Sequence, residues 1–350
     1  MAGEARNKLP NGARVALRFG LKVALTVGAF YLLLTHKVDA GDGTRITIAA
    51  AVHEHLRELD PARFWPLILV AASVKAVGVF ASMVRWQLLL VGQGIRFNFM
   101  HTVGTFLIGR FLGTFLPSTI GLDGYKLYDA AKHSGRAVPA AAATAVEKVM
   151  GLAGIFLTFL ITVPFGYRVL GEHAGLAVAV TVPLAAGVVA AAFALLFQPT
   201  WAPRLAKLAF FGNAKITGFV EKLTASAMAY KGKGRLLAAV AALSFVVHFT
   251  TAALYFFTAL AIGAEGASFG AVSFASSIQI VATVLTPFTI AGEGVREIVQ
   301  ALLLAKHIGA TQSVLSAALG FWAAEALTLS GAFFWWARRG DYRPKAVQVS

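Results

Sequence analysis

Long apolar segments separated by shorter polar ones recur along the whole chain. Six of them are about 20 residues or longer, enough at 1.5 Å per residue for an α-helix to cross the ~30 Å hydrocarbon core of a bilayer. The six predicted spans are residues 15–35, 64–91, 138–163, 174–197, 236–262 and 312–337. The pattern therefore predicts an all-α polytopic membrane protein, with residues 1–350 forming a single transmembrane domain.

Two further apolar regions, residues 98–134 and 270–307, each contain a related ten-residue segment. Residues 117–126 read PSTIGLDGYK and residues 287–296 read PFTIAGEGVR, so that Pro, Thr, Ile and the last Gly are identical, and one acid and one base are kept in type. In each region an apolar arm ends at the proline and a shorter, charged arm follows. Such a segment is tolerated only inside protein or beside water, so we predict two re-entrant helical hairpins.

The distribution of bases predicts how the spans are oriented. The segment before the first span is basic, and residues 198–235 carry seven bases against a single acid. The positive-inside rule places these segments and both termini in the cytoplasm, with residues 36–63 and 164–173 outside the cell membrane. This arrangement requires both hairpins to return to the side they enter. Three spans separate them, so the hairpins enter from opposite faces.

The chain is therefore predicted to divide into inverted repeats at about 14–163 and 174–338. Inverted repeats with broken helices near the bilayer midplane are typical of transporters.

Composition supports this class and excludes others. The chain is 58% hydrophobic and 13% charged, too few charges to cover a soluble protein. Its net charge of +15 lies largely in loops, so we predict no nucleic-acid partner. The absence of cysteine excludes disulfides and thiol chemistry. The pair His53 and His55 lacks the spacing of an HExxH site. We predict no metal, no cofactor and no enzymatic activity, since the sequence holds no catalytic motif.

The hairpin tips are the candidate ligand sites. Glycines there let the backbone turn with positive φ and let a ligand approach closely. These glycines are Gly121, Gly124, Gly292 and Gly294. The second arm begins as a helix whose N-terminus carries about half a positive charge, and Lys126 or Arg296 adds a full charge. We predict an anionic ligand group, with phosphate favoured; the alternative for both bases is a structural ion pair.

The acids beside these bases have three predicted roles. Asp123 and Glu293 could cap the second arm, pair with the base or carry a proton, and Glu297 could carry a proton. Each role follows from a carboxyl group next to a helix N-terminus and a cation.

Charged residues also fall inside the predicted spans, where each costs roughly 2.5–3.5 kcal/mol on insertion scales and usually pairs or lines a path. Arg110 and Glu147 are predicted to pair with each other and to belong to the substrate site. Arg85 is predicted to extend to the inner interface, and Glu325 to lie alone in the last span.

Four motifs resemble one known family. Residues 115–126, FLPSTIGLDGYK, resemble the FLPS-x-x-GGD-x-x-R signature of the lysylphosphatidylglycerol synthase transmembrane-region family, whose members are flippase-like membrane proteins. Residues 147–151, EKVMG, are similar to its E-R-x-x-G, residues 292–297, GEGVRE, to its later P-x-x-GG-x-G-x-x-E, and residues 85–86 to its R-W. The chain departs from these patterns at Leu122, Lys126, Lys148, Ala291 and Glu293.

The resemblance implies a function. The family's best-known members fuse this domain to a soluble aminoacyltransferase and flip the aminoacylated lipid. The transmembrane pattern fills this chain, so the resemblance implies lipid translocation without modification, and a separate lipid-modifying enzyme as a partner. Our leading hypothesis is a flippase or scramblase for a lipid with an anionic headgroup. The alternatives are a proton-driven transporter of a small anionic solute and an intramembrane glycosyl or phosphoryl transferase.

Overall fold

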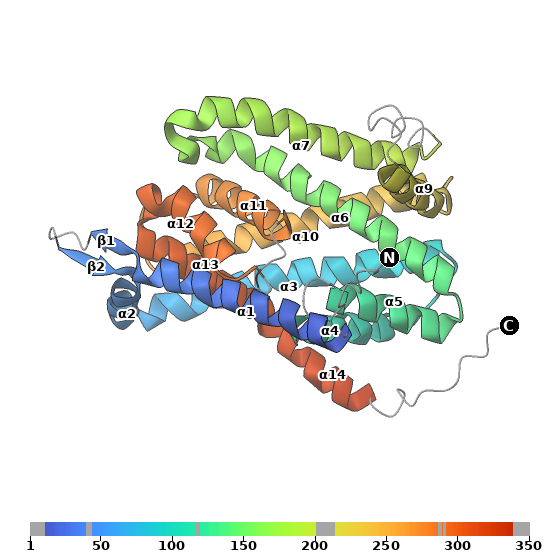
Figure 1. Ribbon diagram of the computed structural model, residues 1–350, viewed down its shortest axis with the longest axis horizontal. Coiled ribbons are helices and arrows are strands. Elements are labelled where there is room, and N and C mark those ends of the chain that lie inside the picture. The colour runs from blue at the N-terminus through green and yellow to red at the C-terminus, as the bar shows by residue number, and fades with distance from the viewer. Residues whose placement is uncertain are drawn as a thin grey trace, which may run out of the picture.

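The computed structural model describes residues 11–39, 44–115, 120–200, 214–285, 289 and 292–338, and these are almost entirely helical (Figure 1). In the first half, the helices are α1 (Asn11–Thr35), α2 (Ile48–Glu58), α3 (Pro61–Gly92), α4 (Phe99–Phe115), α5 (Ile120–Ser134) and α6 (Ala137–Gly166). A 3₁₀ segment, η1 (Tyr167–His173), leads into the second half. It contains α7 (Ala174–Phe197), α9 (Ala214–Met228), α10 (Gly234–Ala261), α11 (Phe269–Leu285), α12 (Val295–Ile308), α13 (Ala310–Glu325), η2 (Ala326–Leu329) and α14 (Ser330–Arg338).

The only strands in the described residues form a short antiparallel pair. Strand β1 (Lys37–Asp39) pairs with β2 (Arg45–Thr47), with Val38 opposite Ile46. The pair lies beside α2 at one end of the bundle (Figure 1). The all-α prediction is otherwise confirmed.

Within the described residues, five helical segments are long and apolar enough to cross a membrane. They cover residues 61–92, 137–172, 174–197, 234–261 and 310–338, and correspond to five of the six predicted spans. The remaining predicted span corresponds to α1, a helix of 25 residues.

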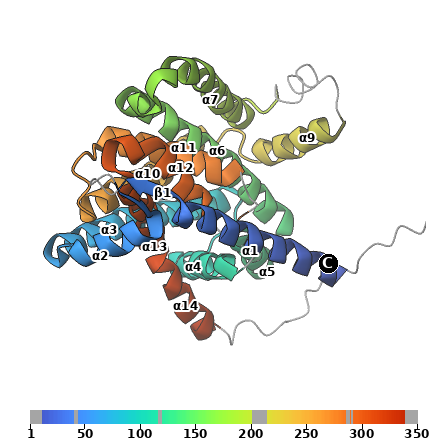
Figure 2. The same cartoon turned by 60° about the vertical axis from the view of Figure 1, so that its left-hand side comes forward.

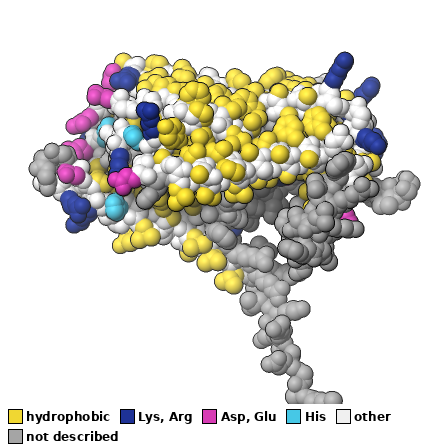
Figure 3. Space-filling view, turned by 90° about the horizontal axis from the view of Figure 1, so that it is seen from above, with side chains coloured by type: hydrophobic (Ala, Val, Ile, Leu, Met, Phe, Trp, Pro, Cys, Tyr) yellow, Lys and Arg dark blue, Asp and Glu magenta, His cyan; other side chains and the backbone are white. Residues whose placement is uncertain are grey.

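The surface of the bundle separates into an apolar belt and two polar ends. Figure 3 shows hydrophobic side chains over the middle of one face and charged groups at both ends. On α7, Leu176, Val180 and Leu184 follow one another at four-residue spacing and are 60–73% exposed. Soluble monomers rarely expose so much contiguous apolar surface, so this belt is the surface that faces lipid.

Helix α10 lies at the centre of the bundle and packs against α3, α6, α11 and α13. Its sequence is apolar all round, as expected for a helix that spans a membrane. Small residues bring its neighbours close. A Cβ at Gly154 of α6 would overlap the main-chain oxygen of Ser244, and one at Gly78 of α3 would overlap the Thr250 side chain. Close approach through small residues is the usual way that membrane helices pack.

Two pairs of short helices occupy the predicted hairpin regions. Helix α4 packs against α5, and α11 against α12. The four helices contain 14 to 17 residues, or roughly 21–26 Å, which is shorter than the hydrocarbon core. Figure 1 shows α5 and α12 towards opposite ends of the bundle. The predicted first-arm ends at Pro117 and Pro287 lie outside the described residues.

The last predicted span is interrupted. Helix α13 ends at Glu325, a 3₁₀ turn follows, and α14 begins at Ser330. Figures 1 and 2 both show α14 leaving the bundle at an angle, with α4 beside it. The break coincides with polar contacts at Glu325, which are described below.

Candidate functional site

A buried ion-pair cluster forms around Glu147 of α6. Lys126 of α5 donates from Nζ to Glu147 Oε2 at 2.5 Å, and Arg85 of α3 donates from Nη2 to Oε1 at 3.1 Å. Glu147, Lys126 and Arg85 are 5%, 1% and 8% exposed respectively. Each carboxylate oxygen therefore serves one base. The cluster ties the first hairpin to two membrane-spanning helices.

The surroundings of the two bases are largely apolar. Nζ of Lys126 lies 4.5 Å from the ring centroid of Trp86 and 5.3 Å from that of Phe106, which are cation–π distances. Arg85 Nη1 donates to Ser244 Oγ of α10 at 3.1 Å. The buried Nε of Arg85 has no hydrogen-bond partner among the described residues. The two bases share one carboxylate, which leaves an excess of positive charge. Because charge is weakly screened in these surroundings, the site favours an added anionic group.

A second pair adjoins this cluster. Asp123 of α5 pairs with Lys148, which follows Glu147 on α6 but is 52% exposed, and its Oδ1 lies 3.7 Å from Lys126 Nζ. Of the three roles predicted for Asp123, the structure therefore shows pairing with a base. Lys126 thus interacts with two carboxylates and is 1% exposed.

The predicted pair of Arg110 and Glu147 is wrong. Arg110 of α4 donates from Nη2 to Glu325 Oε1 at 2.8 Å and from Nε to Thr328 Oγ1 at 3.2 Å. Helix α4 packs against η2 and α14, so Arg110 meets the last span instead of α6. Glu325, predicted to be alone, is therefore paired, and the Thr328 hydroxyl also donates to it.

Arg85 also differs from the prediction. It does not extend to the membrane interface but points into the bundle, because the C-terminal half of α3 packs against α6 and α10. The next residue, Trp86, is 1% exposed. Both residues of the R-W motif are therefore part of the Glu147 cluster.

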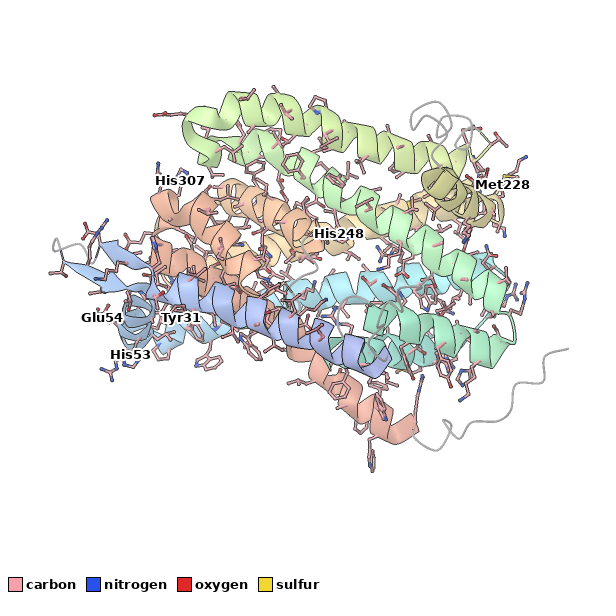
Figure 4. All side chains as sticks on the ribbon, in the orientation of Figure 1. Tyr31, His53, Glu54, Met228, His248 and His307 are labelled. Atoms are coloured by element: carbon pink, nitrogen blue, oxygen red, sulfur yellow. The ribbon has the colours of Figure 1, made fainter. Side chains whose placement is uncertain are left out.

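Basic groups continue from this cluster through the bundle. His248 of α10 is close enough to interact electrostatically with Arg85 and Lys75, and Lys75 of α3 with Arg110, Glu325 and Arg296. Lys75 Nζ also donates to Thr251 Oγ1 at 2.8 Å. Figure 4 shows His248 between the two ends of the bundle, which are marked by His53 and Met228. A series of bases thus connects the regions of the two hairpins.

In the second hairpin, Glu297 caps helix α12 by accepting a hydrogen bond from the Gly294 main-chain N at 2.7 Å. Arg296 is 5% exposed, lies 3.6 Å from Glu297 Oε1, and stacks on the ring of Phe321 of α13 at 4.3 Å. Glu293, for which a capping role was considered, is half-buried. The acid one turn further along the chain caps the helix instead.

The glycines of the two tips behave differently. Gly292 and Gly294 have φ of 78° and 82°, as predicted for a turn. Gly121 and Gly124 instead lie in the first turns of α5, so the prediction of positive φ is wrong for them. The helix begins at Ile120, earlier than expected. The lack of a side chain at Gly121 lets α5 approach Gly113 of α4.

A buried amide network beside Arg296 was missed in the sequence. Gln300 Nε2 donates to Gln279 Oε1 at 3.0 Å and to Ser276 Oγ at 3.1 Å, and Gln279 Nε2 donates to the Tyr255 hydroxyl at 3.2 Å. Gln279 and Gln300 are 2% and 0% exposed. The sequence did contain a signal for this network, because Gln279 and Gln300 each place an amide inside an apolar stretch of one hairpin arm.

The protein has several helices long enough to cross a membrane, an apolar belt around them and buried ion pairs inside the bundle. These features define a multi-pass helical membrane protein. The sequence model of the lysylphosphatidylglycerol synthase TM region matches residues 21–331, and the chain belongs to this family. The match includes both hairpin regions and confirms the family suggested by the four motifs. A search of curated proteins gives no match. Family membership relates the chain to lipid handling.

Proposed function

We propose that this protein translocates a lipid with an anionic, phosphate-containing headgroup across the bilayer, as a flippase or scramblase, without modifying the lipid. Family membership supports a lipid as the substrate. A separate enzyme would then carry out any modification of the headgroup. The proposal takes the two hairpins as re-entrant halves of an inverted repeat, in line with their short arms and their places towards opposite ends of the bundle.

The observation that carries the proposal is the series of bases inside the apolar belt. From Lys126 and Arg85, the series passes His248 and Lys75 and reaches Arg296. Ionisable groups at membrane depth are costly, and in membrane proteins they commonly mark substrate paths. A series of basic groups suits an anion that must cross an apolar layer, because the ammonium and guanidinium groups among them offer charge-assisted hydrogen bonds.

Arg85 offers the most direct contact for a phosphate oxygen. Its Nε–H lacks a partner among the described residues. Lys126 pairs with the same carboxylate as Arg85, that of Glu147. A phosphate could accept from Arg85 Nε without displacing Glu147. Displacing Glu147 would then release Lys126 to the headgroup.

The orientation proposed for the protein follows from the charges at its two ends. The end near α9 carries Lys222, Lys231, Lys233 and Arg235, whereas the opposite end, near α2, mixes both signs (Figure 3). Positive-inside bias favours the basic end as the cytoplasmic one. Both termini and the segment before α10 are then cytoplasmic, in the cell membrane.

The direct test measures lipid translocation in liposomes that contain the purified full chain. An anionic phospholipid labelled on its acyl chain is quenched from outside with dithionite, and movement between leaflets is followed over time. We expect faster exchange than in protein-free liposomes, and slower exchange for a zwitterionic lipid with the same label. Movement at the protein-free rate would refute the proposal. Uptake of soluble glycerol phosphate with no lipid movement would instead support the solute-transporter alternative.

Variants at Arg85 connect the activity to the site. A charge-assisted contact is worth about 1.5–3 kcal/mol, which corresponds to roughly a ten- to hundredfold change in affinity. Arg85→Gln should slow exchange by about tenfold or more. Arg85→Lys keeps the charge but loses Nε–H, and should fall between Arg85→Gln and the native protein. Glu221→Gln, at an exposed acid of α9, is the matched control and should exchange lipid at the native rate.

A further inference from the structure

The first hairpin brings two histidines and an aspartate together at the end of the bundle that holds α5 (Figure 1). His101 belongs to α4, and Asp129 and His133 to α5. His101 Nε2 lies 2.7 Å from Asp129 Oδ2, and His133 Nδ1 lies 3.3 Å from Asp129 Oδ1. We expected the histidines not to form a metal site; the structure instead places two of them on one carboxylate.

The three side chains share the geometry of a cation site. One ligand atom from each residue lies within 4.8 Å of the other two. Metal–ligand bonds of about 2.0–2.2 Å around zinc place ligand atoms roughly 3.3–3.5 Å apart, so small side-chain adjustments bring these atoms to bonding positions. Asp129 and His133 are four residues apart and therefore project from one face of α5.

Access and burial are also suited to an ion. The Asp129 side chain is 1% exposed, while those of His101 and His133 are 24% and 30% exposed. The carboxylate thus forms the floor of the site, and the imidazoles border the solvent from which an ion enters. A buried carboxylate gains most from a cation, because water screens it poorly.

Neighbouring groups orient the three side chains. Thr105 Oγ1 donates to Asp129 Oδ2 at 2.6 Å, and His133 Nδ1 lies 2.9 Å from the Asp129 main-chain oxygen. Hydrogen bonds of this kind fix the ligands in known metal sites. Arg338 of α14 donates to the His101 main-chain oxygen at 2.9 Å, so the last helix braces the same turn of α4.

We propose that His101, Asp129 and His133 form a binding site for a divalent transition-metal ion, with zinc favoured by the ligand set. Two imidazoles and one carboxylate are three protein ligands that zinc accepts, with water in the fourth position. The ion would connect α4 to α5 and so clamp the base of the first hairpin. The ion binds His101 Nε2 in its deprotonated form, so a proton carried on this nitrogen moves to Nδ1 or to solvent on binding.

Cobalt(II) is a suitable probe because its visible absorption reports coordination geometry. The full chain is purified in detergent with an affinity tag that contains no histidine, stripped with a chelator, and titrated with Co²⁺. We expect one equivalent to bind, with the intense visible bands of a four- or five-coordinate site that Zn²⁺ then abolishes. Absence of saturable binding, or only the weak spectrum of hexaaqua cobalt, would overturn the proposal.

Variants show whether these residues are the ligands. Asp129→Asn and His133→Gln should each weaken Co²⁺ binding by at least about tenfold, as loss of a supporting group around a metal already does. His53→Ala, an exposed histidine of α2 beside Glu54 (Figure 4), is the matched control and should bind as the native protein does.

Thermal unfolding provides a second readout. Zn²⁺ should raise the midpoint of the native chain and of His53→Ala but not that of His133→Gln, because binding to the folded state alone stabilises it. Equal stabilisation of His133→Gln would assign the metal to other residues. The outcome does not depend on lipid translocation, so this proposal and the proposed function can fail separately.

Discussion

Replacing Glu147 by Gln tests whether the buried cluster holds the first hairpin in place. The substitution keeps the length and most of the volume of the side chain but removes its charge. Arg85 would then lose its carboxylate partner, and Lys126 would keep only the more distant Asp123, at 3.7 Å. An uncompensated charge in an apolar interior is among the costliest defects that a single substitution produces.

The geometry sets the size of the effect. Glu147 accepts two charge-assisted hydrogen bonds, at 3.1 Å from Arg85 and 2.5 Å from Lys126. Removing one partner of a buried pair costs about 3–5 kcal/mol. The amide oxygen introduced by Glu147→Gln can still accept one hydrogen bond, so we expect the lower part of this range, about 3 kcal/mol of unfolding free energy.

Equilibrium unfolding of the purified chain in mixed micelles by added SDS measures this loss. The double variant Glu147→Gln with Lys126→Met removes one of the stranded charges and should be more stable than the sum of the two single losses predicts, by about 0.5–3 kcal/mol. Glu221→Gln, at an exposed acid, should stay within about 0.5 kcal/mol of the native chain. A loss below about 0.5 kcal/mol for Glu147→Gln, or strict additivity in the double variant, would show that the cluster does not stabilise the fold.

Three further predictions follow from the other charged groups. Arg110→Gln and Glu325→Gln should each destabilise the chain by about 1–3 kcal/mol and be non-additive in the same SDS assay; additive losses would mean that the 2.8 Å contact contributes nothing. Lys126→Gln should slow lipid uptake mainly from the inner leaflet and Arg296→Gln mainly from the outer, each by about tenfold or more, in vesicles of known protein orientation; native rates in both would leave these bases as structural ion pairs. Lys231→Cys should react with an impermeant thiol reagent only after the cytoplasmic side is exposed, and reaction from outside intact cells would invert the orientation.

The positions of the helices could be predicted because hydropathy and charge act locally along the chain. The apolar runs that correspond to α3 and α10 exceed the thickness of the bilayer core, so their helical state follows from the need to satisfy the backbone in lipid. The repeated segment also located both pairs of short helices. The break after Glu325 was missed, because residues 312–337 read as one apolar run.

The partners of the charged side chains could not be predicted in the same way. Glu147 has several bases at similar depth, and hydropathy says nothing about which direction a helix faces. The packing of α3 against α6 turns Arg85 towards Glu147, and the packing of α4 against α14 turns Arg110 away from it. His101 and His133 are far apart in the sequence and meet because α4 and α5 fold against each other.

The Glu147 cluster connects stability with the proposed translocation. Lys126 belongs to the hairpin, whereas Arg85 and Glu147 belong to spanning helices, so any movement of α5 away from α6 must break the Lys126–Glu147 pair. That step is unfavourable unless another anion takes over the base. An anionic headgroup on Arg85 and Lys126 would supply that charge and lower the cost of the movement. The ligand would thus favour the conformation that transports it, as required of any ligand that shifts a conformational equilibrium.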